Sequence, residues 1–385
     1  MPERFYHRHA MATTYAAKIM ADPLHPGLFL AAPRRTGKTT FMREDLAPAL
    51  QLAGAEVIYV DLWSNRQTDP AELINQAVQV AIERNLGLIA KLTKQSGVVK
   101  LKVGGVEIDT GSIGKAKGVT LAAALAALSD SLGKPIVLII DEAQHAVTTA
   151  AGSNTLFALK AARDELNGSH HHGLRLICTG SSRDKLAMLR NSRDQAFFNA
   201  PLVNFPHLDR GYVDWFCAQS RLDFTLDPEV VWSKFVEAGY RPEALQAARE
   251  LLEYSMIDDA AVGNVAFAEA VDEHVREMSE SALAVIRSLT PIQAAVLKVM
   301  AVQGKDYAPF ELATLGKYAE MLQLAGMSEA QAQEAAYAQN VQQALAALQE
   351  KALIWKAERG VYAIEEQGLP DLMRSAGMLP DASSN

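Results

Sequence analysis

Two short stretches of the sequence combine side chains that could hold phosphate groups and a divalent metal ion. In the first, APRRTGKTTF at 32–41, Gly37, Lys38 and Thr39 stand where the phosphate-loop pattern G-x-x-x-x-G-K-[ST] places them, although Ala32 replaces the first glycine. Such a lysine reaches the β- and γ-phosphates, and such a threonine hydroxyl is a ligand of Mg²⁺. The loop residues expected to contact the phosphates are Pro33, Arg34, Arg35, Thr36, Gly37, Lys38, Thr39 and Thr40.

The second stretch is PIVLIIDEAQHA at 135–146, an apolar run that ends in Asp141 and Glu142. Carboxylates at the carboxyl end of a buried strand lie where open α/β sheets bind ligands. Asp141 would hold Mg²⁺, and Glu142 would orient or deprotonate the water that attacks the γ-phosphate. Each stretch also has a plainer reading: a basic turn before a capped helix, and a pair of acids that caps the next helix. Their joint presence favours a nucleotide site.

The elements around these stretches predict how they are positioned. The apolar run at 27–32 reads as a central strand, and 39–54 reads as the helix that follows the loop, so its N-terminus would face the phosphates. Further apolar runs at 55–63, 174–181 and 200–205 predict three more strands, the last at an edge. Together with the strand at 135–140 they predict an α/β fold with a parallel, five-stranded, doubly wound sheet.

In order and spacing, APRRTGKT, IIDEAQ and TGSSRDKL resemble the archaeal-type AAA+ ATPases, whose loop reads GPRRxGKT. The resemblance spans roughly residues 15–285 and implies ATP and Mg²⁺ as ligands. It also implies that the strand at 174–181 lies between the loop strand and the carboxylate strand. Its tip would carry a polar sensor of the γ-phosphate, with Ser181 the best match and Thr179 and Ser182 its neighbours. An ordinary Ser/Thr turn is the alternative.

The same resemblance implies a helical lid after the sheet. EAGYRPEALQAARELLE at 237–253 is similar to the lid helix that carries a second sensor arginine, and Arg241 would reach the phosphates from there. The family's arginine finger has no clear match, because AFFNAPL stands at 196–202. Arg190 and Arg193 are possible substitutes, so ring assembly is in doubt and a homo-oligomer stays open.

From Thr290 onward the pattern predicts three helices and then two short strands within 354–366, which together look like a winged helix. The expected domains are an AAA+ core at 1–206 with a basic hairpin insertion near 91–118, a helical lid at 207–287, a winged-helix-like domain at 288–375 and a flexible tail at 376–385.

Composition and charge limit the classes of partner. The chain has 385 residues, 49% hydrophobic and 21% charged, with a formal net charge of −8, so DNA binding would need a local basic patch. Residues 91–117 offer one, with six lysines against two acids, whereas 290–375 holds seven basic and ten acidic residues. DNA is therefore a possible partner of the insertion, and a protein partner is at least as suitable for the winged helix.

Other classes of protein find little support. Cys178 and Cys217 are too few for a disulfide framework, no apolar run is long enough for a bilayer, and we expect a cytoplasmic protein. The three histidines at 170–172 are consecutive on a loop and would point in different directions, which disfavours a metal site there. Two functions remain open. One is a regulatory or DNA-transaction ATPase of a bacterial or mobile-element system, and the other is a slowly hydrolysing signalling or scaffold switch that recognises protein only.

Overall fold

The fold is described from a computed structural model of the whole chain. The description covers all residues except 1–4, 23–26, 34, 66, 93–99, 104–105, 110–112, 115–117, 169, 182, 190–195, 198–199, 359, 367 and 380–385. The chain divides into two compact units, an N-terminal unit at 1–219 and a C-terminal unit at 220–385. Within the described residues, no helix is both long and apolar enough to cross a membrane.

The N-terminal unit is built on one five-stranded sheet in which every neighbouring pair is parallel, so the predicted α/β class is confirmed. The β6 strand lies between β1 and β5, and β7 is at an edge, both as predicted. In spatial order the strands are β2 (Glu56–Asp61), β5 (Ile136–Asp141), β6 (Leu174–Gly180), β1 (Leu28–Ala31) and β7 (Leu202–Asn204).

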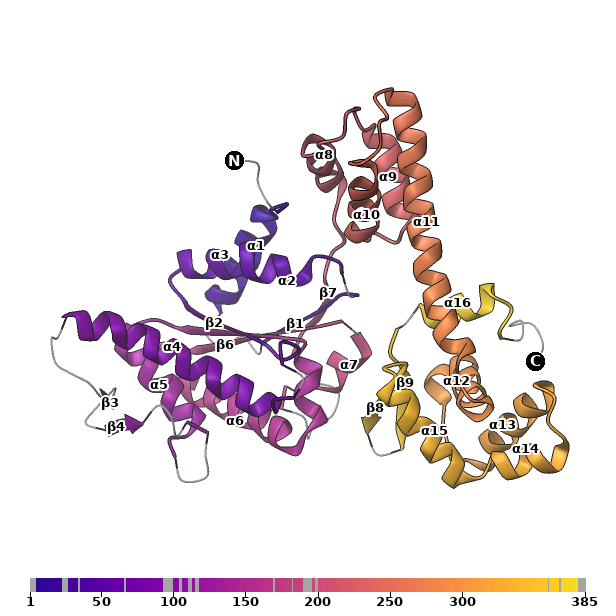
Figure 1. Cartoon of the computed structure of the whole chain (residues 1–385). Helices are drawn as coiled ribbons and strands as arrows, with labels where there is room; N and C mark the ends of the chain where they lie inside the picture. Colours follow the sequence, from indigo (N-terminus) through magenta and orange to yellow (C-terminus); the bar gives the residue numbers. More distant parts are fainter. Residues whose placement is uncertain are drawn as a thin grey trace. The chain divides into compact units, whose positions relative to one another are not determined.

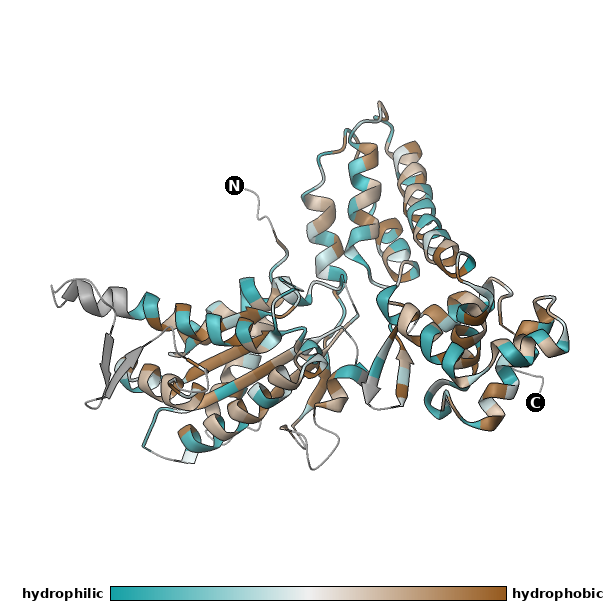
Figure 2. Ribbon diagram, turned by 60° about the horizontal axis from the view of Figure 1, so that its bottom comes forward, coloured by the Kyte–Doolittle hydropathy of each residue, from teal (hydrophilic) through white to brown (hydrophobic). Residues whose placement is uncertain are grey.

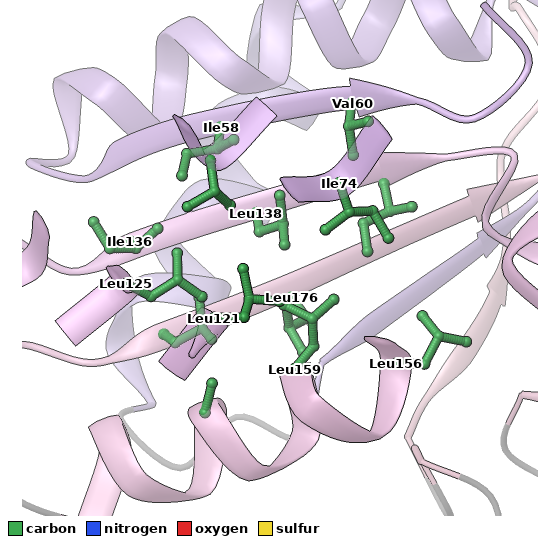
Figure 3. Packing of buried hydrophobic residues seen from close by; sticks show 14 of the residues in the cluster. Ile58, Val60, Ile74, Leu121, Leu125, Ile136, Leu138, Leu156, Leu159 and Leu176 are labelled. Atoms are coloured by element: carbon green, nitrogen blue, oxygen red, sulfur yellow. The ribbon is translucent and has the colours of Figure 1, made fainter. Parts of the chain in front are cut away.

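Two layers of helices cover the sheet (Figure 1). One face is covered by α1 (His9–Ala21), η1 (Phe41–Leu46) and α3 (Ala47–Leu52), and the other by α4 (Pro70–Leu92), α5 (Leu121–Leu132) and α6 (Ala150–Gly168). Successive side chains of a strand point to opposite faces, so the apolar run of β5 divides between the two layers. Val137 and Ile139 join the first layer, and Ile136, Leu138 and Ile140 join the second. Figure 3 shows this second core.

The helix after the phosphate loop is continuous but irregular. It begins as α2 (Lys38–Thr40), continues as the π-helix η1 and returns to α-helix in α3. The amide of Ala47 bonds the carbonyl of Met42, five residues back, and Pro48 has no amide hydrogen to donate. The predicted helix at 39–54 is therefore present, with a one-residue bulge that its apolar spacing did not reveal.

The N-terminal unit also contains a small hairpin and two further helices. The expected hairpin in the basic insertion is present as antiparallel strands β3 (Lys100–Val103) and β4 (Val106–Asp109), while its turn at 104–105 lies outside the described residues. Helices α7 (Arg183–Met188) and α8 (Arg210–Ala218) flank β7 in the sequence.

The C-terminal unit is helical apart from one hairpin. Its first part contains α9 (Pro228–Glu237), α10 (Pro242–Leu252) and the 28-residue α11 (Ala260–Arg287). Its second part contains α12 (Pro291–Gln303), α13 (Leu312–Leu324), α14 (Glu329–Ala335), α15 (Ala338–Glu350), the antiparallel strands β8 (Ile354–Glu358) and β9 (Val361–Ile364), and α16 (Leu369–Ser375). In Figure 2 these helices alternate hydrophobic and hydrophilic residues, as amphipathic helices around a core do.

This second part differs from the sequence prediction in two elements. The short helix α14 begins with a capping box between Ser328 and Gln331, and α16 follows the hairpin. Neither was expected, because seven residues are too few to display a clear helical period. Four helices rather than three therefore precede the hairpin, and the winged-helix assignment and the four domain boundaries stay predictions.

Candidate nucleotide-binding site

The loop between β1 and α2 has the backbone that a phosphate-binding turn needs. Gly37 has φ +80° and Arg35 has φ 65°, both in the left-handed region, which costs glycine little and other residues about 1–2 kcal/mol. Thr36 is buried, and its hydroxyl donates to the carbonyl of Pro33 at 2.9 Å, closing the turn. Arg34 lies outside the described residues.

Ala32 fits the position where the loop pattern has glycine. It is buried, has no positive φ, and its amide donates to the carbonyl of Gly180 on β6 at 3.1 Å. The conformational freedom of glycine is therefore not needed there. Alanine in place of the first glycine of the phosphate-loop pattern therefore causes no backbone strain in the loop.

The two motifs meet at the carboxyl ends of β1 and β5. Lys38 is buried, and its Nζ lies 2.8 Å from Glu142 Oε1 and 3.6 Å from Asp141 Oδ1. The Thr39 hydroxyl donates to Asp141 Oδ2 at 2.7 Å. Residues about a hundred positions apart thus form one polar cluster, and Thr40 follows on the same short helix.

Asp141 receives two further hydrogen bonds that the sequence did not suggest. The hydroxyl of Tyr59, on β2, donates to Oδ2 at 2.9 Å, and the hydroxyl of Thr179, on β6, donates to Oδ1. Tyr59 carries the guanidinium of Arg43 over its ring, 4.5 Å from the centroid. Because β2 and β6 are the direct neighbours of β5, their side chains converge on the strand end that carries Asp141.

Glu142 is held in a fixed position beside the loop. Its backbone has φ 54° and ψ 43°, a left-handed conformation that is uncommon outside glycine and clusters at functional sites. Ser181 contacts its Oε2 through both the backbone amide, at 3.3 Å, and the hydroxyl, at 3.1 Å. The amide of Gln144 donates to the same oxygen. Ser181 is therefore in this cluster, while its neighbour Ser182 lies outside the described residues.

The electrostatics keep both carboxylates ionised. Burial alone would raise the pKa of Asp141 and of Glu142, but the ammonium group of Lys38 and the surrounding hydrogen-bond donors outweigh it, so both pKa values are lowered. Asp61, paired with Asp141 in the register of β2 and β5, has a raised pKa because of burial and the charge of Asp141. Two charged carboxylates beside one lysine suit a site for phosphate and a cation.

The residues present fit Mg²⁺. Mg²⁺ takes oxygen ligands, and it is commonly bound by one or two carboxylates together with substrate phosphates and water. The Thr39 hydroxyl and the Asp141 carboxylate lie together at the end of the loop.

The remaining predicted residues lie in the C-terminal unit or outside the described residues. Arg241 is exposed and is the N-cap of α10, in the C-terminal unit. Arg190 and Arg193 lie outside the described residues. Gln144 and Tyr59 were missed by sequence reasoning, although the position of Gln144, two residues after Glu142, was a usable signal.

The sheet order, the loop and the strand-end carboxylates define a P-loop nucleoside-triphosphatase fold. Residues 26–186 match the family model described as an AAA domain. Among solved structures, the chain is similar to the Aeropyrum pernix ORC2 protein in its ADP form, with a TM-score of 0.52 and 14% identity over 98% of this chain and 96% of that chain.

The chain is also similar to the Aeropyrum pernix ORC1 protein in complex with DNA, with a TM-score of 0.46 and 15% identity over 97% of this chain and 94% of that chain. No curated protein sequence matches it significantly. The expected resemblance to archaeal-type AAA+ ATPases is confirmed at the level of the fold.

Proposed function

We propose that the protein binds ATP with Mg²⁺, hydrolyses it, and uses its nucleotide state to control binding to DNA or to a protein partner. The observation that carries this proposal is the meeting of Lys38 with Glu142 and of Thr39 with Asp141 at one edge of the sheet. These are the four side chains that phosphate binding, metal binding and activation of water require.

In this proposal separate residues bind the phosphates, activate the water and hold the metal ion. Lys38 neutralises the β- and γ-phosphates, and the loop residues from Pro33 to Thr40 surround them, all but Pro33 with a backbone amide to donate. Glu142 accepts the proton of the attacking water or orients it, which its lowered pKa permits because the carboxylate is already ionised. Mg²⁺, held by Thr39 and Asp141, would supply charge neutralisation on the phosphate oxygens.

Ser181 and Arg241 have supporting roles. Ser181 contacts Glu142, so it can report whether the γ-phosphate side of the site is occupied. Arg241 lies at the N-terminus of α10, the positive end of the helix dipole. A cation at this end is electrostatically unfavourable. A phosphate bound nearby would offset that cost, which supports Arg241 as the second sensor.

The choice between DNA and protein as the controlled partner rests on charge. The insertion at 91–117 carries a net charge of +4, which supports DNA as its ligand. The segment 290–375 has a net charge of −3, which supports the second candidate function, a slowly hydrolysing switch that recognises protein through its winged helix. A homo-oligomer is compatible with either function.

The test is steady-state ATP hydrolysis with Mg²⁺, with and without duplex DNA. The wild type is compared with Glu142→Gln, with Lys38→Ala, and with Glu320→Gln, a control at an exposed position of α13. The ATPase proposal requires turnover in the wild type and control, loss of turnover but not of ATP binding in Glu142→Gln, and loss of binding in Lys38→Ala. Stimulation by DNA supports the first function. Tight binding with negligible turnover, with or without DNA, supports the switch, and no ATP binding refutes both.

A further inference from the structure

A second polar cluster on the N-terminal unit is formed by residues that are not part of the nucleotide site. It joins His7, just before α1, and His9, the first residue of α1, to the π-helix η1. His7 Nδ1 is 2.7 Å from Asp45 Oδ1, and His9 Nδ1 is 3.8 Å from the same oxygen. The two imidazole rings stack with centroids 4.8 Å apart and planes inclined by 7°. Two ring nitrogens therefore converge on one carboxylate.

The carboxylate of Asp45 is built into the fold. Its side chain is 1% exposed, and its other oxygen, Oδ2, accepts the backbone amide of Arg8 at 3.0 Å. Metal-binding carboxylates are typically held in this way by a hydrogen bond from outside the ligand set. Single π-helical turns also recur at functional sites, and here Asp45 lies within η1.

We propose that His7, His9 and Asp45 bind a divalent transition-metal ion, for which Zn²⁺ is the best chemical match. Two imidazoles and a carboxylate form a ligand set typical of zinc, with a fourth position left for water. Ligand atoms about 2.1 Å from a tetrahedral ion lie about 3.4 Å from one another. The two observed nitrogen–oxygen distances, 2.7 and 3.8 Å, lie on either side of that value, and the three ligand atoms lie within 4.8 Å of one another. Because the two rings are stacked and nearly parallel, the exposed His9 ring must rotate for both imidazoles to face one ion.

The role of His9 distinguishes a metal site from a His7–Asp45 pair that only stabilises the fold. A hydrogen-bonded pair with Asp45 needs only His7. The side chain of His9 is 74% exposed and is too far from Asp45 for a hydrogen bond, yet its ring is parallel to that of His7. Loss of the His9 ring would cost the fold little but would remove one of three metal ligands.

The ion would connect the start of the chain to the nucleotide loop. Since η1 continues directly from Lys38–Thr40, a metal at Asp45 would tie the segment before α1 to the helix that carries the phosphate-binding lysine. The same segment reaches further through Arg8, whose guanidinium donates to the carbonyls of Pro206 and His207 at 2.9 and 3.0 Å. The cluster would therefore fasten several parts of the N-terminal unit together.

The test is calorimetric titration of the tag-free, full-length protein with ZnCl₂ at about pH 7.5, where unperturbed imidazoles are mostly neutral. Mg²⁺ is present throughout to occupy oxygen-rich sites. His9→Ala is the diagnostic variant. His171→Ala is the matched control, because His171 also pairs with a carboxylate, Asp130, near a second histidine, His170.

The expected result is one Zn²⁺ per chain, bound at least about tenfold more weakly by His9→Ala and equally well by His171→Ala. A visible d–d spectrum of bound Co²⁺ should be lost in the same variant, and circular dichroism should show that His9→Ala is folded. The proposal is overturned if the wild type binds no Zn²⁺, if His9→Ala binds it as tightly as the wild type, or if His171→Ala is the variant that loses it.

Discussion

The hydroxyl of Thr39 donates a 2.7 Å hydrogen bond to Asp141, although the two residues lie on different motifs and 102 positions apart. This bond joins the start of α2 to the end of β5, the two places that would supply the Mg²⁺ ligands in the proposed function. Lys38, one residue earlier, makes the parallel contact to Glu142. The two contacts together align the loop with the carboxylates.

The contact between Lys38 and Glu142 leads to a prediction for Glu142→Gln. The amide is nearly the same size and can still accept from Ser181, but it cannot take a proton from water. We expect ATP to bind within a few fold of the wild-type affinity while turnover falls about 10²–10⁴-fold. Nucleotide binding by fluorescence and phosphate release would be measured on the same sample. Equal turnover in variant and wild type would remove Glu142 from the catalytic role.

Lys38→Ala should reverse the pH dependence of stability in the acid range. In the wild type the pKa values of Asp141 and Glu142 are lowered, so the unfolded state binds more protons and stability rises with pH as these groups ionise. Without the ammonium group, burial and mutual repulsion raise both pKa values, so the folded state binds more protons and stability falls with rising pH in that window.

Denaturant unfolding between about pH 2 and pH 8 would measure this reversal, because the wild-type change lies below the ordinary carboxyl pKa and that of the variant above it, against Lys317→Ala as an exposed control. At neutral pH we expect Lys38→Ala to lose up to about 3 kcal/mol of unfolding free energy, since it leaves two carboxylates without their cation. Parallel stability curves for the wild type and Lys38→Ala would contradict the prediction.

Tyr59→Phe should weaken the metal site without dismantling it. The variant removes the 2.9 Å hydrogen bond to Asp141 Oδ2, so the carboxylate loses one of the donors that orient it and lower its pKa. We expect ATP binding to need an about tenfold higher Mg²⁺ concentration, and the free energy of unfolding to fall by about 1 kcal/mol. The measurement is ATP binding as a function of Mg²⁺ concentration at fixed ATP. Tyr254→Phe is the control, because Tyr254 is 91% exposed. Identical Mg²⁺ curves would mean that Tyr59 only packs there.

Ala32→Gly restores the sequence pattern of the phosphate loop, yet we expect no gain in nucleotide affinity. Ala32 has no positive φ and its methyl group is buried, so glycine would add chain entropy to the unfolded state and remove apolar contact. The expected cost is about 1 kcal/mol of unfolding free energy. Thermal unfolding and ATP titration measure the two effects separately, and a marked increase in affinity would show that the loop of the wild type is constrained.

DNA binding, if it occurs through the basic insertion, should depend steeply on salt. Replacing Lys100 and Lys102 together by alanine should reduce the slope of log K against log salt by about 0.9 for each DNA phosphate that is no longer neutralised. Lys305→Ala with Lys317→Ala, in the acidic C-terminal segment, should leave the slope unchanged. No binding by the wild type at low salt would exclude DNA and leave the protein-recognising switch.

The sequence predicted the parts of this site that depend on local pattern. A short, continuous apolar run followed by acidic residues, as at Ile136–Ile140, is typical of a buried parallel strand with a ligand site at its carboxyl end. The structure has such a strand there, β5. Gly37, Lys38 and Thr39 likewise match the phosphate-loop pattern, and they lie at a turn before a helix. The strand order was predicted only through the family resemblance.

The partners of Asp141 were not predictable in the same way. Tyr59 lies on a strand whose sequence indicates only burial, and its contact with Asp141 follows from the neighbouring positions of β2 and β5 in the sheet. The π-helical turn at Asp45 was missed because a one-residue bulge shifts the helical period by too little to appear in six residues.

The long helix α11 limits how the C-terminal unit can respond to any signal. It runs for 28 residues, about 42 Å, without a proline, and its one glycine, Gly263, lies in the first turn. Near its start it packs on α9 and α10, where Phe267 and Val271 are buried, and near its end Leu283 and Ile286 enter the core that includes α12. Because α11 is continuous, a tilt imposed where it packs on α9 and α10 would be transmitted to the core that includes α12 instead of being absorbed along the helix.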